Sequence, residues 1–167
     1  MPVPAFAPAS LFMRQNLPRL LARYQIRCAA EGDCMAYFII SRASGRELSQ
    51  NLMISLNRFS RRIEIIRFYP QFYTRPDTKF FSAASLYLMI HHFAQFFRIA
   101  APYQIFVRTR PQVYAQFYRS LLDFNFHPVF EMPGTIDLAA DYVRSDVDTS
   151  MVASVPSAEQ HAAFMVV

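Results

Sequence analysis

The chain has 167 residues, enough for one domain with a full hydrophobic core but too few for two stable domains. Hydrophobic residues make up 53% and charged residues only 17%, which excludes a disordered, highly charged chain. The net charge is +5, but residues 131–167 hold half of the acidic side chains and a single arginine. A basic body with an acidic end predicts an anionic partner: a phosphate-bearing cofactor, an acidic carrier protein or nucleic acid. A solvated basic surface that the tail partly neutralises would give the same pattern.

Residues 1–9 contain three prolines and predict an extended arm. No basic segment precedes an apolar one there, so we do not expect a signal peptide. Ser10 has the chemistry of an N-cap for a helix that continues to about residue 24. Pro18 lies inside this helix and predicts a kink or a division into two shorter helices.

Three strands are expected next, and together they predict the first half of a sheet. A turn at Gly32 precedes a strand at residues 34–41. Residues 52–59 alternate between apolar and polar side chains, as in a strand with one buried face. Residues 63–69 are mostly apolar, so we expect this strand at the centre of the sheet with both faces covered.

The second half of the chain predicts the remaining elements of one domain. They are a loop at 71–79, an apolar helix at 82–97, a strand at 102–107, a helix at 112–124 and a hairpin at 129–138. This order predicts an α/β or α+β domain over residues 10–142, with one central mixed sheet flanked by helices. Residues 143–167 show little periodicity and predict an acidic, weakly structured tail.

The sequence shows no pattern for a membrane span, a zinc or redox cysteine pair, or a metal site. The stretch 80–97 is interrupted by polar side chains, so we expect no membrane span. Cys28 and Cys34 lack zinc or redox spacing, which predicts two reduced thiols in a cytoplasmic protein. His91 and His92 would point about 100° apart on a helix, so they cannot chelate one metal ion, and we expect no metal. We expect a structural or interface role for them instead.

Two stretches resemble the GCN5-related N-acetyltransferase (GNAT) family. Residues 63–70 read Ile-Glu-Ile-Ile-Arg-Phe-Tyr-Pro, similar to the family's central strand, apolar-Glu-x-x-apolar-x-Pro. Residues 115–118 resemble its Ala-x-x-aromatic-Tyr motif, with Asn125 and Phe126 where Gly-Phe would stand. The resemblance implies a single GNAT-like domain that moves an acyl group from acyl-CoA or an acyl carrier protein to an amine.

The resemblance also implies two catalytic residues. Glu64 would be the general base and Tyr118 the acid that protonates the departing thiolate. The sequence leaves alternatives open for both. Glu64 could instead form an ion pair with Arg58, Arg61 or Arg67, or face solvent. Tyr118 could instead be one more packed aromatic residue of its helix.

The chain departs from the family at the phosphate loop, because no glycine lies between Tyr73 and Ser85. Glycines there let backbone N–H groups approach a pyrophosphate at a helix N-terminus. We therefore expect an altered donor site that uses side chains and the open N–H groups of residues 82–85. The candidate cofactor contacts are Arg67, Tyr69, Thr74, Arg75, Thr78, Lys79, Ser82, Arg108 and Arg110. An acyl carrier protein as the donor would fit the loss of the glycines.

Three functions stay open at this stage. The first is the acyltransferase, and the second is a non-catalytic binding or assembly protein on the same scaffold. The 17 Phe and 9 Tyr exceed what one small core holds, which predicts an aromatic interface and a homo-oligomer or another protein partner. The third is a nucleic-acid-binding protein, in which the arginines and aromatic residues around 58–62 and 108–110 would contact phosphates and stack on bases. The apolar runs around these residues argue against it.

Overall fold

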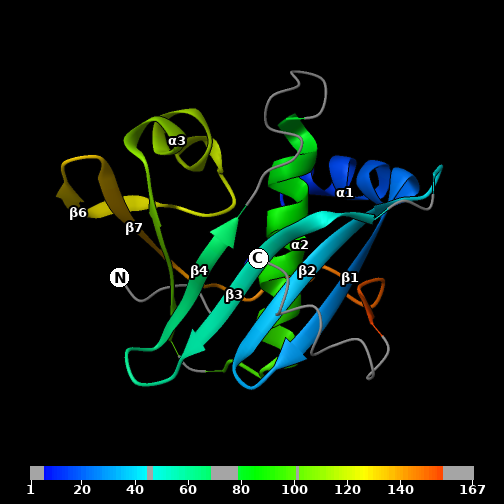
Figure 1. Cartoon of the computed structure of the whole chain (residues 1–167), viewed down its shortest axis with the longest axis horizontal. Coiled ribbons are helices and arrows are strands. Elements are labelled where there is room, and N and C mark those ends of the chain that lie inside the picture. Colours follow the sequence, from blue (N-terminus) through cyan, green and yellow to red (C-terminus); the bar gives the residue numbers. More distant parts are fainter. Residues whose placement is uncertain (1–5, 45–46, 69–78, 101, 156–167) are drawn as a thin grey trace.

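The computed structural model describes residues 6–44, 47–68, 79–100 and 102–155. They form one mixed sheet of eight strands in the order β6-β7-β5-β4-β3-β2-β1-β8, with three α-helices in the described part of the chain. This confirms the expected α+β domain with one mixed sheet. Figure 1 shows α1 and α2 behind the sheet, so these two helices cover one of its faces.

Helix α1 (Leu11–Arg23) begins where the sequence predicts. The Ser10 hydroxyl accepts a hydrogen bond from the Met13 N–H at 3.2 Å, which satisfies one of the open donors of the first turn. Pro18 is tolerated inside a single helix, contrary to the possible division into two, because it removes only one backbone donor. The buried side of α1 packs on α2 and includes Met13, Leu17 and Leu20.

Strands β1 (Tyr24–Glu31), β2 (Cys34–Ser41), β3 (Glu47–Asn57) and β4 (Arg62–Phe68) form an antiparallel meander. The sequence patterns predict β2, β3 and β4 but not β1, which contains two alanines and follows α1 without a break. Alanine is depleted in strands, so its local signal is weak. Gly32 closes the β1–β2 hairpin with φ of 58°, a left-handed conformation that glycine adopts without strain.

Helix α2 (Lys79–Phe96) connects β4 to β5 (Gln104–Thr109), and these two strands are parallel. After β5 the chain forms α3 (Pro111–Gln116) and a short 3-10 helix, η2 (Tyr118–Ser120), in place of one longer helix. Strands β6 (His127–Met132) and β7 (Thr135–Asp141) form the expected hairpin, and β7 inserts between β6 and β5.

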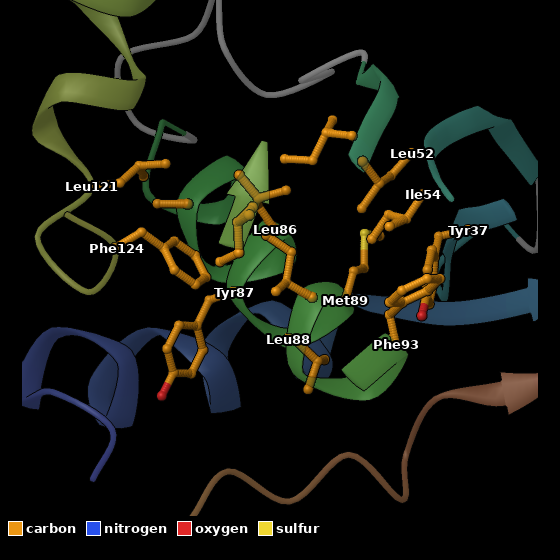
Figure 2. Packing of buried hydrophobic residues seen from close by; sticks show 14 of the residues in the cluster. Tyr37, Leu52, Ile54, Leu86, Tyr87, Leu88, Met89, Phe93, Leu121 and Phe124 are labelled. Carbon is orange, nitrogen blue, oxygen red and sulfur yellow. The ribbon is translucent and has the colours of Figure 1, made fainter. Parts of the chain in front are cut away.

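Helix α2 is the centre of the core, and every residue from 81 to 91 is buried. Figure 2 shows its side chains Leu86, Met89 and Phe93 among residues from both sides of the helix. Tyr37, Leu52 and Ile54 reach it from the strands, while Leu121 and Phe124 reach it from the segment after α3. The nearly uniform apolar character of α2 follows from being surrounded in this way. No helix in the described residues is both long and apolar enough to cross a membrane.

Residues 143–155 pack against the domain, although the sequence predicts a weakly structured tail from residue 143. Strand β8 (Ala153–Ser154) pairs in parallel with β1, and Val152 is buried. The Ala7 N–H donates to the Arg144 carbonyl at 2.8 Å, and the Ala9 N–H donates to Asp146 Oδ1 at 2.9 Å. These contacts join segments far apart in the sequence, so local periodicity gives no signal for them.

Candidate functional site

The two central parallel strands separate at their carboxyl ends. β4 and β5 pair only from Arg62–Gln104 to Ile65–Val107. Beyond that point β4 continues along β3 as far as Phe68, while β5 continues along β7 as far as Thr109. We call this divergence the β4–β5 fork. Figure 1 shows that the amino end of α2 lies toward the same end of the sheet as the carboxyl end of β4. In open α/β sheets, ligands bind outside the carboxyl ends of the strands.

A β-bulge in β4 lies at the fork. Met53 pairs with Arg67 and Ile54 pairs with Ile65, which leaves Ile66 as an extra residue. Residues three apart on a regular strand point to opposite faces, but the bulge places Arg67 on the same face as Glu64. It also turns Phe68 toward the helical face, where its ring centroid lies 5.5 Å from that of Phe117.

Glu64 lies on the sheet face away from α2 and is half-buried. Its Oε1 accepts a hydrogen bond from Asn57 Nδ2 at 3.0 Å, and Asn57 Oδ1 in turn accepts from the Ser60 N–H at 3.0 Å. Phe106 is its partner across the β4–β5 ladder, and the Arg62 guanidinium stacks on that ring at 4.5 Å. The carboxylate is therefore oriented by an amide, with an aromatic ring beside it.

Arg108, one of the expected cofactor contacts, is already paired with a carboxylate. Its Nε and Nη2 donate to the two oxygens of Asp137 at 2.7 and 3.0 Å, across the β5–β7 ladder. This bidentate hydrogen bond lowers the pKa of Asp137. The pair joins two strands, so Arg108 has less capacity for a phosphate than the sequence implies.

The remaining expected cofactor contacts fall into three groups. Tyr69, Thr74, Arg75 and Thr78 lie outside the described residues. The side chain of Lys79, the first residue of α2, is also outside them, while Arg67 and Arg110 are at least partly exposed near the fork. Ser82 is fully buried, and its hydroxyl has no hydrogen-bond partner within the described part of the chain.

The amino end of α2 differs from the sequence prediction. The helix begins at Lys79, three residues before the expected start at Ser82. The open N–H groups of a helix belong to its N-cap and first turn. The N–H groups of residues 83–85 therefore lie within the helical ladder, and the expectation that they bind a phosphate is wrong.

Tyr118 lies in the core rather than at an open surface. Its residue surface is 3% exposed, and its ring meets those of Phe117 and Phe126 edge-on at 5.1 and 5.2 Å. Burial raises the pKa of its phenol, which makes it a weaker acid. Because this cluster packs on the α2 side, Tyr118 and Glu64 lie on opposite faces of the sheet.

An apolar cavity of about 320 Å³ lies on the helical side, next to the fork. It is bounded by the start of α1, the first turns of α2 and the segment after α3, and it is partly open to solvent. Its lining residues are Ser10, Phe12, Met13, Ala83, Phe117, Ser120, Leu121, Leu122 and Asp123. No local sequence pattern indicates this cavity, because it forms only where three distant segments meet.

The adjacent histidines of α2 point to different partners. His91 Nδ1 lies 3.3 Å from the Tyr142 hydroxyl, and His92 Nδ1 lies 2.8 Å from the Tyr37 hydroxyl. Burial lowers the pKa of each imidazole to about 4, so both are neutral at pH 7. Across the described residues, no group of three or more His, Cys, Asp or Glu side chains could hold a metal ion.

Comparison of the chain with protein-family models, with curated proteins and with solved structures finds no match. No relative therefore supplies a substrate, a cofactor or a residue role. A functional conclusion for this chain has to come from its own geometry and chemistry.

Proposed function

We propose that the protein is a GNAT-like acyltransferase that takes an acyl group from a thioester of coenzyme A or an acyl carrier protein and transfers it to an amine. The β4–β5 fork is the observation that carries this proposal. Diverging strands expose main-chain edges to which an extended, amide-containing pantetheine arm can hydrogen-bond, as a peptide does in strand addition. The amino end of α2 lies on the same side, where the helix dipole favours phosphate.

The chemistry requires little beyond positioning and proton transfer. The amine nitrogen attacks the thioester carbonyl carbon, a C–N bond forms, the C–S bond breaks, and the thiolate leaves. The proton lost by the amine goes to a base, for which Glu64 is suited by its half-exposed position and its hydrogen bond from Asn57. The thiolate takes up a proton from water, because Tyr118, the donor that the family resemblance implies, is buried on the opposite face of the sheet from Glu64.

Donor binding provides the direct test. A thioester donor that binds the folded state should stabilise it by about 2.7 kcal/mol at a concentration of 100 Kd. We expect acyl-CoA, or an acylated carrier protein, to raise the melting temperature, and oligonucleotides to leave it unchanged. Stabilisation by oligonucleotides but by neither donor would refute the proposal.

A variant pair tests the proposed base. Glu64→Gln keeps an acceptor for Asn57 but removes the base, so turnover with amine acceptors should fall about 10²- to 10⁴-fold while donor binding is retained. Glu131→Gln makes the same change at an exposed glutamate of β6 and serves as the matched control. Equal turnover in both variants would show that Glu64 is not the base.

One observation favours the second candidate, a binding or assembly protein. Val129, Phe130 and Met132 of β6 are 49%, 56% and 43% exposed, which gives this edge strand an apolar surface. Pro128 and a register shift beside it work against pairing through the strand edge, so contact would involve the side chains. Light scattering of the wild type and Phe130→Asp tests it: an oligomer that dissociates in the variant supports an interface here.

A further inference from the structure

We propose that the apolar cavity beside the fork holds the alkyl chain of the donor, so that the protein uses a medium-chain acyl group in preference to acetyl. This inference rests on the proposed acyltransferase function and names its donor class. The cavity is lined mainly by apolar side chains, among them Met13, Phe117 and Leu121. An engineered apolar cavity of about 150 Å³ binds benzene, and this partly open one has about 320 Å³.

The position of Phe117 connects the cavity to the fork. Its ring lines the cavity and also packs on Phe68, at the last described residue of β4. Ala83, in the first turns of α2, lines the same cavity with the smallest side chain of the set. A thioester held at the fork therefore lies beside the cavity, and its acyl chain can extend into the helical side of the sheet.

A carboxylate in the cavity lining limits the charge that a bound ligand can carry there. Asp123 accepts from the Ser10 hydroxyl at 2.9 Å and from the Ser10 N–H at 3.3 Å, which anchors the carboxylate beside the start of α1. A second carboxylate or a phosphate beside it would be repelled. The part of the ligand inside the cavity is therefore uncharged, as an alkyl chain is. A free fatty acid entering carboxylate first is excluded on this ground.

The volume limits the length of the chain. Since a cavity of about 150 Å³ holds the six carbon atoms of benzene, 320 Å³ accommodates on the order of ten carbon atoms. Leu122 lines the cavity but is 92% exposed, so a large apolar side chain stands at its mouth in contact with solvent. A bound alkyl chain would cover it.

Calorimetry of acetyl-, hexanoyl-, decanoyl- and hexadecanoyl-CoA, with 1-decanol as a probe that lacks coenzyme A, tests the inference. Each buried methylene should tighten binding about fourfold. Affinity should rise from acetyl to decanoyl and stop rising at hexadecanoyl, which outgrows the cavity. 1-Decanol should bind weakly at the same place and compete with decanoyl-CoA.

Ala83→Leu fills the cavity and should abolish the dependence of affinity on chain length. Ala22→Leu makes the same change at an exposed position of α1 that does not line the cavity, so it should keep the dependence. Leu122→Asp, on an exposed side chain that does not endanger folding, should weaken decanoyl-CoA at least tenfold and is informative even if Ala83→Leu fails to fold.

The outcomes separate this inference from the proposed function. Acyl-CoA binding that is equally tight for every chain length would overturn the inference and leave the acyltransferase proposal standing. Binding of 1-decanol without binding of any coenzyme A derivative or acylated carrier protein would overturn both. Chain-length dependence that is lost in Ala83→Leu and retained in Ala22→Leu supports both.

Discussion

Acid should destabilise the protein because His91 is buried in its neutral form. His91 is 2% exposed and packs among Tyr87, Phe124 and Tyr142, and burial lowers the pKa of its imidazole from 6.5 to about 4. Between these two values the unfolded chain binds a proton that the folded chain does not, so stability rises with pH. At 1.36 kcal/mol per pKa unit, the folded state should lose about 3 kcal/mol as the pH falls from 7 toward 4. His92, which is more exposed, adds a smaller loss in the same window.

Urea unfolding at several values between pH 7 and pH 4.5 measures this effect. The wild type should show a falling free energy of unfolding, and the slope should be shallower in His91→Gln, which removes the titrating group. His127→Gln removes an imidazole from the exposed strand β6 and controls for the substitution itself. A wild type that is equally stable at both ends of the range, or a His91→Gln variant with the wild-type slope, would refute the reasoning.

Three further outcomes follow from buried and paired groups. Ser82→Ala should be about 1 to 2 kcal/mol more stable than Ser85→Ala in chemical denaturation, because the buried Ser82 hydroxyl has no partner among the described residues, while the Ser85 hydroxyl donates to a carbonyl at 3.0 Å. Equal stabilities would show that Ser82 finds a partner in solution. Arg108→Gln should raise the pKa of Asp137 in a carboxyl NMR titration, and an unchanged value would exclude the ion pair. Phe93→Ala should lower the free energy of unfolding by about 3 to 5 kcal/mol, because the Phe93 side chain of α2 is fully buried in the core. A loss below 1 kcal/mol would contradict that packing.

The sequence predicts those elements whose local pattern matches their final environment. Residues 82–97 are apolar almost all round, and the helix they form is surrounded by the rest of the core. The apolar run at residues 63–69 predicts a central strand, and β4 lies between β3 and β5. The expectation that both of its faces are covered is wrong, because burial alternates along β4 and Ile66 is 53% exposed. The prediction that Ser10 caps α1 is also confirmed. In each case the signal, a run of apolar side chains or a serine before a free N–H group, lies within a few neighbouring residues.

The features that define the candidate site depend on contacts between distant segments. Nothing in Ile65-Ile66 indicates that one of them is an extra residue, because the bulge is visible only against β3. The burial of Tyr118 depends on Phe126 and on the segment that reaches α2, and the neutralisation of Arg108 depends on Asp137 of β7. Burial in a tertiary core and cross-strand pairing are outside the range of local patterns.

The parallel pairing of β8 with β1 bears on how the chain is made. β1 leaves the ribosome early, whereas Ala153 and Ser154 follow more than a hundred residues later. Until then the part of the β1 edge at Arg27 and Cys28 lacks its partner strand, and nascent chains can associate there. A chain that stops before Ala153 would therefore have a longer open edge on β1, and we expect it to aggregate more than its loss of buried surface alone would suggest.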